Sequence, residues 1–111
     1  MIPIEHVQKM LVLFEDSKRL VTIKGDKYDV LLEPLPDINL QTINVNRCLL
    51  TLRAKHTIDI YYTLSKISLY KYANYNVSYY NNYLQISYII DNNQLTNDML
   101  INNISLMEQL I

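Results

Sequence analysis

The sequence predicts an α+β fold in which three helices pack on an antiparallel sheet of about five strands, in the order αβββαββα. Three observations lead to this prediction. Apolar residues recur every three or four positions at both ends of the chain, which is typical of helices. Between the ends, short runs alternate apolar and polar residues, which is typical of half-buried strands. A single glycine among 111 residues argues against a fold made mostly of tight turns.

The length and composition predict one domain over residues 1–111. Half of the residues are apolar and 19% are charged, which excludes a disordered chain. One cysteine permits no internal disulfide and suits a reducing compartment. No apolar run is long enough to span a membrane, and the amino terminus lacks the pattern of a signal peptide. We therefore expect a protein of the cytoplasm.

The first helix is predicted over residues 4–16. Pro3 suits the first turn of a helix, where its missing N–H costs nothing, and Glu5 lies near the positive end of the helix dipole. An apolar stripe follows at helical spacing: Ile4, Val7, Met10, Leu11 and Phe14.

Three strands are expected next. Residues 20–24 and 28–33 are β-rich, and the Gly25-Asp26 pair between them marks a hairpin turn. The prolines at positions 34 and 36 are expected to end the second strand, because proline cannot donate to a ladder. Residues 38–43 are predicted to form the third strand.

Residues 46–65 present two patterns. One set recurs at helical spacing: Leu50, Ala54, Ile58, Tyr61 and Leu64. A shorter set alternates as in a strand: Ile58, Ile60, Tyr62 and Leu64. Because Asn46 suits a helix N-cap and the run contains neither proline nor glycine, we expect the middle helix here.

The second half is predicted to contain a long hairpin and a final helix. Strands are expected over residues 67–73 and 83–90, joined by the turn residues 74–82, and Leu84, Ile86, Tyr88 and Ile90 should share one face. Thr96 is expected to cap the final helix. Its apolar residues cover a wide arc, which indicates contact with another chain: Met99, Leu100, Ile101, Ile104, Met107, Leu110 and Ile111.

The sequence indicates no catalytic, cofactor or metal site. His6 and His56 belong to different predicted helices, and Cys48 stands beside two leucines as a small buried hydrophobe would. A single glycine excludes the glycine-rich loops that hold phosphates and nucleotides. We therefore expect no enzyme, no cofactor and no bound metal.

Seven of the ten tyrosines lie in residues 66–91. Stacking on nucleic-acid bases needs a basic groove as well as aromatic rings. Lys66 and Lys71 are the only cations in this stretch, and the net charge of the chain is −1. A single-strand nucleic-acid binder is therefore disfavoured. Because tyrosine is enriched at protein interfaces, the outward-facing rings are expected to contact another polypeptide.

Nearly the whole chain resembles the small chaperones of bacterial type III secretion. The resemblance rests on the order of elements and on four segments: EDSKRL, LVTIKGDKYDVLLEPLP, NVNRCLLTLRAKHTIDIYYTLS and LTNDMLINNISLMEQLI. The Met/Leu-Glu-x-Leu-Ile ending of the last segment resembles the gatekeeper chaperones in particular. The net charge departs from the family, whose members are often clearly acidic.

This resemblance implies a virulence-associated chaperone that binds the unfolded amino-terminal segment of a secreted effector or gatekeeper protein. It also implies a homodimer, or a heterodimer with a second small chaperone, formed through the middle helix or its adjoining strands. The residues expected at the dimer interface are Leu50, Ala54, Ile58 and Tyr61. The residues expected to contact the substrate are Val7, Leu11, Phe14, Tyr70 and Tyr72. The alternative is a small viral or plasmid-encoded protein that inhibits a host complex by binding to it.

Overall fold

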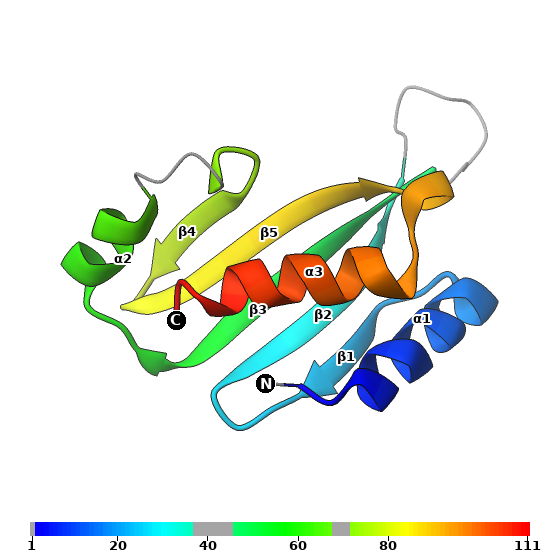
Figure 1. Cartoon of the computed structure of the whole chain (residues 1–111), viewed down its shortest axis with the longest axis horizontal. Coiled ribbons are helices and arrows are strands. Elements are labelled where there is room, and N and C mark those ends of the chain that lie inside the picture. The colour runs from blue at the N-terminus through cyan, green and yellow to red at the C-terminus, as the bar shows by residue number, and fades with distance from the viewer. Residues whose placement is uncertain (1, 37–45, 68–71) are drawn as a thin grey trace.

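A computed structural model places the chain in one sheet with helices packed against it (Figure 1). The structure describes residues 2–36, 46–67 and 72–111. Within them the elements are α1 (Ile4–Ser17), β1 (Val21–Lys24), β2 (Tyr28–Leu35), β3 (Arg47–Thr57), α2 (Ile60–Ile67), β4 (Asn76–Tyr80), β5 (Tyr83–Asp91), a short 3-10 helix η2 (Asn92–Gln94) and α3 (Asn97–Glu108). The predicted α+β class and the order αβββαββα are confirmed.

All neighbouring strands are antiparallel, in the order β1-β2-β3-β5-β4. Figure 1 shows α3 crossing the sheet in front of β3, with α1 beside β1. The two helices also contact each other, so they cover one face of the sheet together. α2 lies apart from them, at the end of the molecule where β4 and β5 meet (Figure 1).

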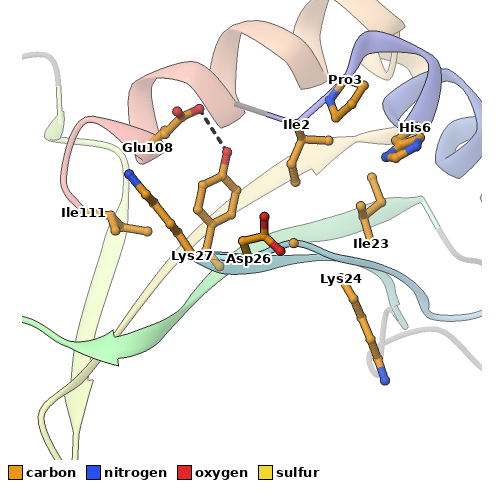
Figure 2. A pocket seen from close by; sticks show the side chains of 11 residues that line it. Ile2, Pro3, His6, Ile23, Lys24, Asp26, Lys27, Glu108 and Ile111 are labelled. Carbon is orange, nitrogen blue, oxygen red and sulfur yellow. Dashed lines mark hydrogen bonds between the residues drawn. The ribbon is translucent and has the colours of Figure 1, made fainter.

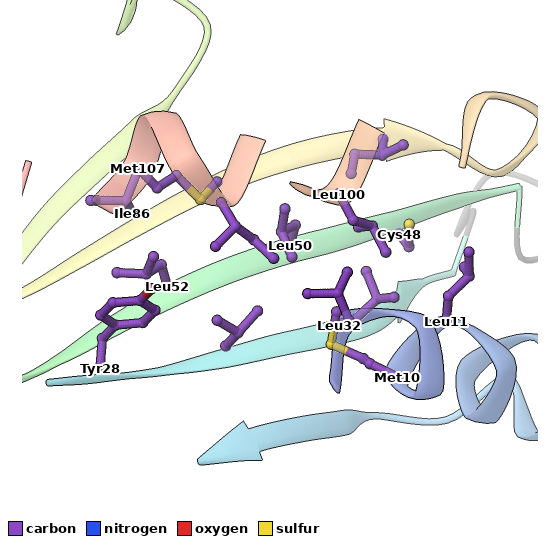
Figure 3. Close-up of a cluster of buried hydrophobic side chains, with 14 of the residues drawn as sticks. Met10, Leu11, Tyr28, Leu32, Cys48, Leu50, Leu52, Ile86, Leu100 and Met107 are labelled. Carbon is purple, nitrogen blue, oxygen red and sulfur yellow. The ribbon is translucent and has the colours of Figure 1, made fainter. Parts of the chain in front are cut away.

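The core lies between this face of the sheet and the two long helices (Figure 3). Every second residue of β3 points into it, and the aligned residues of β5 do the same. The stripe predicted on the first helix is confirmed from Val7 onward, whereas Ile4 is exposed. The largest fully buried side chains come from both helices and the three inner strands: Phe14, Met10, Leu32, Leu50, Leu52, Leu84, Ile86, Ile90, Leu100, Met107, Leu110 and Val30.

The prediction of a helix from residue 46 is wrong over residues 47–57, which form the central strand β3. Cys48, Leu50, Leu52 and Ala54 are buried and turned towards the helices, and of the three residues between them only Thr51 is also buried. β2 pairs with one side of β3 and β5 with the other, and pairing on both sides overrides the local helical spacing. A helix does follow, but α2 covers only Ile60–Ile67.

Three other expectations change at the strand ends. β2 continues past Pro34 to Leu35, because β1 has already ended there and Pro34 has a strand on one side only. The strand expected over residues 67–73 is wrong at both described ends, since Ile67 closes α2 and Tyr72 lies in a turn. β4 instead occupies Asn76–Tyr80, inside the predicted turn region. The strand expected over residues 38–43 lies outside the described residues.

The second hairpin and the last helix follow their sequence signals closely. Asn81 and Asn82 form the turn between β4 and β5, both with positive φ, a conformation that asparagine tolerates better than most residues. The predicted cap of α3 is confirmed, because the Met99 amide donates to the Thr96 Oγ1 at 3.1 Å.

Candidate functional site

Six large apolar or aromatic side chains are exposed at the end of the molecule formed by α2 and the β4–β5 turn. They are Ile60, Tyr61, Tyr62, Leu64, Tyr80 and Tyr83, and we refer to them as the α2 surface. Tyr61 and Tyr80 are the most exposed, at 79% and 78%. The Ile58 amide donates to the Asn82 carbonyl at 3.2 Å, which ties the start of α2 to the turn between β4 and β5.

The α2 surface is nearly free of charge. Residues 72–90 contain no charged side chain, and the same holds for Ile60–Ser65. Asp59 and Lys66 flank the run, and Lys66 lies over the Tyr62 ring at 3.8 Å and donates to the Gln109 carbonyl at 2.6 Å. Its charge is thereby directed towards an aromatic face and the end of α3.

α2 exposes its apolar residues because it is short and makes few contacts with the core. Asp59 accepts a hydrogen bond from the Tyr61 amide through its Oδ1 at 2.9 Å, which satisfies one free amide of the first turn. Thr63 is the only buried residue of the helix. The helix therefore presents most of its apolar side chains outward.

The structure separates the four residues expected at the dimer interface. Leu50 and Ala54 belong to β3 and are buried in the core of their own chain, so they cannot contact a partner. Ile58 is half-buried against the core, and Tyr61 is exposed on α2. The expectation failed for Leu50 and Ala54 because one continuous helix was predicted where the chain forms the strand β3 and then the helix α2.

The residues expected to contact substrate do not form an open surface. Val7, Leu11 and Phe14 are buried under α1, and Tyr72 is 3% exposed. Tyr70 lies outside the described residues. The three helix residues were identified correctly as an apolar stripe, but that stripe packs on the chain's own sheet.

Tyr72 belongs instead to a cluster of rings beneath α3. The Tyr75 ring lies 6.2 Å from the Tyr72 ring and 5.1 Å from the Tyr88 ring. The Tyr75 hydroxyl donates to the Asn103 Oδ1 at 2.6 Å, and the Tyr72 hydroxyl donates to the Gln109 Oε1 at 3.0 Å. Burial, and then the neighbouring tyrosines, raise the pKa of Tyr75 to about 12. These rings serve the fold, unlike Tyr80 and Tyr83.

A second feature is a cleft at the amino-terminal end of α1. Its polar part is a cavity of about 410 Å³ between the start of α1, the β1–β2 turn and the end of α3 (Figure 2). The Tyr28 hydroxyl donates to the Glu108 Oε2 at 2.9 Å across it. Burial, and then this bond to Glu108, raise the pKa of Tyr28, so the hydroxyl stays protonated. The walls also carry the cation of Lys27 and the carboxylate of Asp26, together with the imidazole of His6.

The apolar part of the cleft is a groove of about 190 Å³ between α1 and α3. Ile2 and Glu108 line both the groove and the polar cavity, so the two parts adjoin. We refer to them together as the β1 cleft. The groove is lined by Ile2, Ile4, Val7, Ile101, Ile104, Ser105 and Glu108.

The described residues provide neither a metal centre nor a reactive thiol. Among the described residues no three His, Cys, Asp or Glu side chains are placed to hold a metal ion. Burial raises the pKa of the Cys48 thiol to about 11, so the thiolate form is disfavoured near neutral pH. Within the described part of the chain, no helix is long and apolar enough to cross a bilayer.

Some residues of the α2 surface and of the β1 cleft were indicated by the sequence. The wide apolar arc of the last helix pointed to contact beyond the core, and Ile101 from that arc lines the groove. The sequence predicted exposed rings in residues 66–91 but named Tyr70 and Tyr72 for contact, whereas the described rings that are exposed there are Tyr80 and Tyr83. The exposure of Ile60, Tyr62 and Leu64 was missed because the middle helix was expected to begin fourteen positions too early. No protein-family model matches the chain, and no curated protein or solved structure is significantly similar to it.

Proposed function

We propose that this protein is a type III secretion chaperone of the bacterial cytoplasm, which acts as a dimer and keeps an unfolded segment of a secreted protein extended. The observation that carries the proposal is the α2 surface. It exposes four tyrosines and two aliphatic residues and contains no charged side chain. Interfaces are enriched in tyrosine and depleted of charge at their centres.

A symmetric dimer is the simplest assembly that covers this surface. In a two-fold dimer the same patch faces itself, so a patch without charge meets no like-charge repulsion. The element order αβββαββα supports the same proposal through its resemblance to the secretion chaperones, in which the middle helix takes part in the dimer. In this chain α2 occupies that position in the order.

The test of the dimer is the mass in solution of three proteins. We expect the wild-type chain to scatter light as twice its 13.1 kDa mass. Leu64→Asp places a charge on the α2 surface and should give the monomer mass. Leu20→Asp is the matched control, because Leu20 and Leu64 are both 53% exposed and Leu20 lies outside the α2 surface, immediately before β1. A monomeric wild type, or a dimeric Leu64→Asp variant, would overturn assembly through this surface.

The secretion role is tested separately with a display library that tiles the proteins encoded in the source genome. The immobilised dimer should enrich amino-terminal tiles over internal tiles of the same proteins, because the proposed client segment is amino-terminal and unfolded. Equal enrichment of both classes, or none, contradicts a secretion chaperone. If no tile is enriched and the immobilised protein instead captures a folded host protein in a separate pull-down, the inhibitor alternative is favoured.

A further inference from the structure

The β1 cleft joins a charged cavity to an aliphatic groove, and the two parts meet at Ile2 and Glu108. The cavity, of about 410 Å³, falls within the range of small-molecule sites, about 300–1,000 Å³. The adjoining groove, of about 190 Å³, has room for a single side chain. A ligand that fills both parts must therefore be small, with a polar end and an aliphatic end.

Glu108 offers a fixed carboxylate at the junction of the two parts. Its Oε2 accepts a hydrogen bond from the Tyr28 hydroxyl at 2.9 Å, and Tyr28 is only 4% exposed, so the bond holds the carboxylate in place. A carboxylate has about four acceptor positions, so Glu108 can accept from a ligand while it keeps this bond. Asp26 lines the same cavity and adds a second negative charge. Both carboxylates favour a ligand with an ammonium group at its polar end.

Lys27 places the opposite charge in the same cavity. Figure 2 shows Lys27 and Glu108 at the same end of the cavity, beside Ile111. His6 lies at the other end, and the Lys24 side chain points away from both (Figure 2). The end of the cavity that adjoins the groove therefore presents a cation as well as a carboxylate, which suits a ligand that carries both charges.

The groove accounts for the aliphatic end of the ligand. Its walls are isoleucine and valine side chains of α1, α3 and the residues before α1, apart from Ser105 and Glu108. An aliphatic side chain buried there gains free energy in proportion to the apolar area that it removes from water. A branched side chain should therefore bind more tightly than a methyl group.

We propose that the β1 cleft binds a free aliphatic α-amino acid, such as leucine or isoleucine, as the zwitterion. The ammonium group donates to Glu108, the carboxylate accepts from Lys27, and the side chain enters the groove between α1 and α3. An α-amino acid carries all three groups on one carbon, so they reach three walls at the junction of the cavity and the groove. This inference goes beyond the proposed function and does not depend on it.

The probe is L-leucine, titrated into the full-length protein by calorimetry. Glu108→Gln keeps an acceptor for the Tyr28 hydroxyl but removes the negative charge, so it should weaken binding at least tenfold. Glu15→Gln is the matched control, because Glu15 is an exposed carboxylate of α1 that lines neither part of the cleft. Glu15→Gln should bind leucine as the wild type does. No binding to the folded wild type, or equal binding by the two variants, would overturn the site.

Ligand analogues test each contact separately. Leucinamide lacks the carboxylate and isocaproate lacks the ammonium group, so each should bind the wild type at least tenfold more weakly than leucine. Lys27→Gln should weaken the binding of leucine but not of isoamylamine, which has no carboxylate to lose. The dipeptide leucyl-serine distinguishes a free amino acid from the first residue of a polypeptide. Binding of leucyl-serine as tight as that of leucine would contradict a site for free amino acids.

The groove is tested by the preference for leucine over alanine. Ile4→Ala should lower this preference severalfold, because Ile4 lines the groove. Val12→Ala is the matched control on α1, since Val12 is 57% exposed against 53% for Ile4 and does not line the groove. Equal affinity of the wild type for leucine and alanine, or the same loss of preference in both variants, would contradict the role of the groove.

Failure of this inference is distinguishable from failure of the proposed function. The α2 surface and the β1 cleft share no residue, so Leu64→Asp should bind leucine as the wild type does. A dimer that enriches amino-terminal tiles but does not bind leucine would retain the chaperone proposal and reject the amino-acid site.

Discussion

At the scale of single residues, the tyrosines divide into two groups with different surroundings. Tyr72, Tyr75 and Tyr88 pack together under α3, and two of their hydroxyls donate to amide oxygens of that helix and its last turn. Tyr61 and Tyr80 are instead 79% and 78% exposed to solvent. The amino-acid composition does not distinguish buried from exposed tyrosines. The two groups differ because α3 packs over the first and not over the second.

Tyr75→Phe should destabilise the protein by about 1–3 kcal/mol, because it leaves the buried Asn103 Oδ1 without the hydroxyl that donates to it. Tyr80→Phe removes a hydroxyl from an exposed ring and should change stability by less than about 0.5 kcal/mol. Urea denaturation followed by circular dichroism measures both. A loss no larger for Tyr75→Phe than for Tyr80→Phe would contradict the role of this hydrogen bond.

Tyr75→Phe should also change how the stability of the protein depends on pH in the alkaline range. The pKa of Tyr75 is raised in the fold to about 12 from its ordinary 10.0. The stability that this shift contributes is present below pH 10.0 and is lost as pH rises towards about 12, because the unfolded tyrosine ionises first. The unfolding free energy of Tyr75→Phe should therefore fall less steeply than that of the wild type over this interval.

At the scale of elements, the sequence predicted correctly those that carry one clear pattern. α1, β1, β5 and α3 each have a single stripe or alternation, and their positions were predicted to within a few residues. Residues 47–57 contain Leu50 and Ala54 at helical spacing and also alternate. What decides between the two patterns is pairing with β2 and β5, which are distant in the chain, so no local signal resolves it.

Substitutions on the two faces of β3 test the assignment of residues 47–57 as a strand. Leu50→Ala should destabilise by about 2–5 kcal/mol, since Leu50 is fully buried among core residues. Leu49 lies on the opposite face and is half-buried, so Leu49→Ala should cost less. The two residues are neighbours, which makes them a matched pair for chemical denaturation. Equal losses for the two variants would contradict the strand assignment.

The candidate sites were less predictable than the fold, for a physical reason. A stripe of apolar residues marks a face that is buried, but it does not state whether the chain's own sheet or another molecule buries it. Val7, Leu11 and Phe14 were covered by the chain itself, whereas the apolar residues of α2 were left outside. Whether an apolar helix face is buried by the chain itself depends on how much of the helix lies against the sheet.

At the scale of the whole molecule, the proposed dimer predicts that thermal stability depends on protein concentration. If the native state is a dimer, the midpoint of thermal unfolding rises with protein concentration by mass action. We expect this rise for the wild type and for Leu20→Asp, and a constant midpoint for Leu64→Asp. Differential scanning calorimetry over a range of concentrations measures it. A concentration-independent midpoint for the wild type would contradict an obligate dimer.

The absence of charge over residues 72–90 has a further consequence for the newly made chain. Charged residues beside hydrophobic strands normally keep partly folded polypeptides from associating edge to edge. The β4–β5 hairpin has no charged residue before Asp91 at the end of β5, and its isoleucine- and tyrosine-rich strands have high β propensity. If the proposed dimer forms, newly made chains that accumulate faster than they pair should therefore form insoluble deposits.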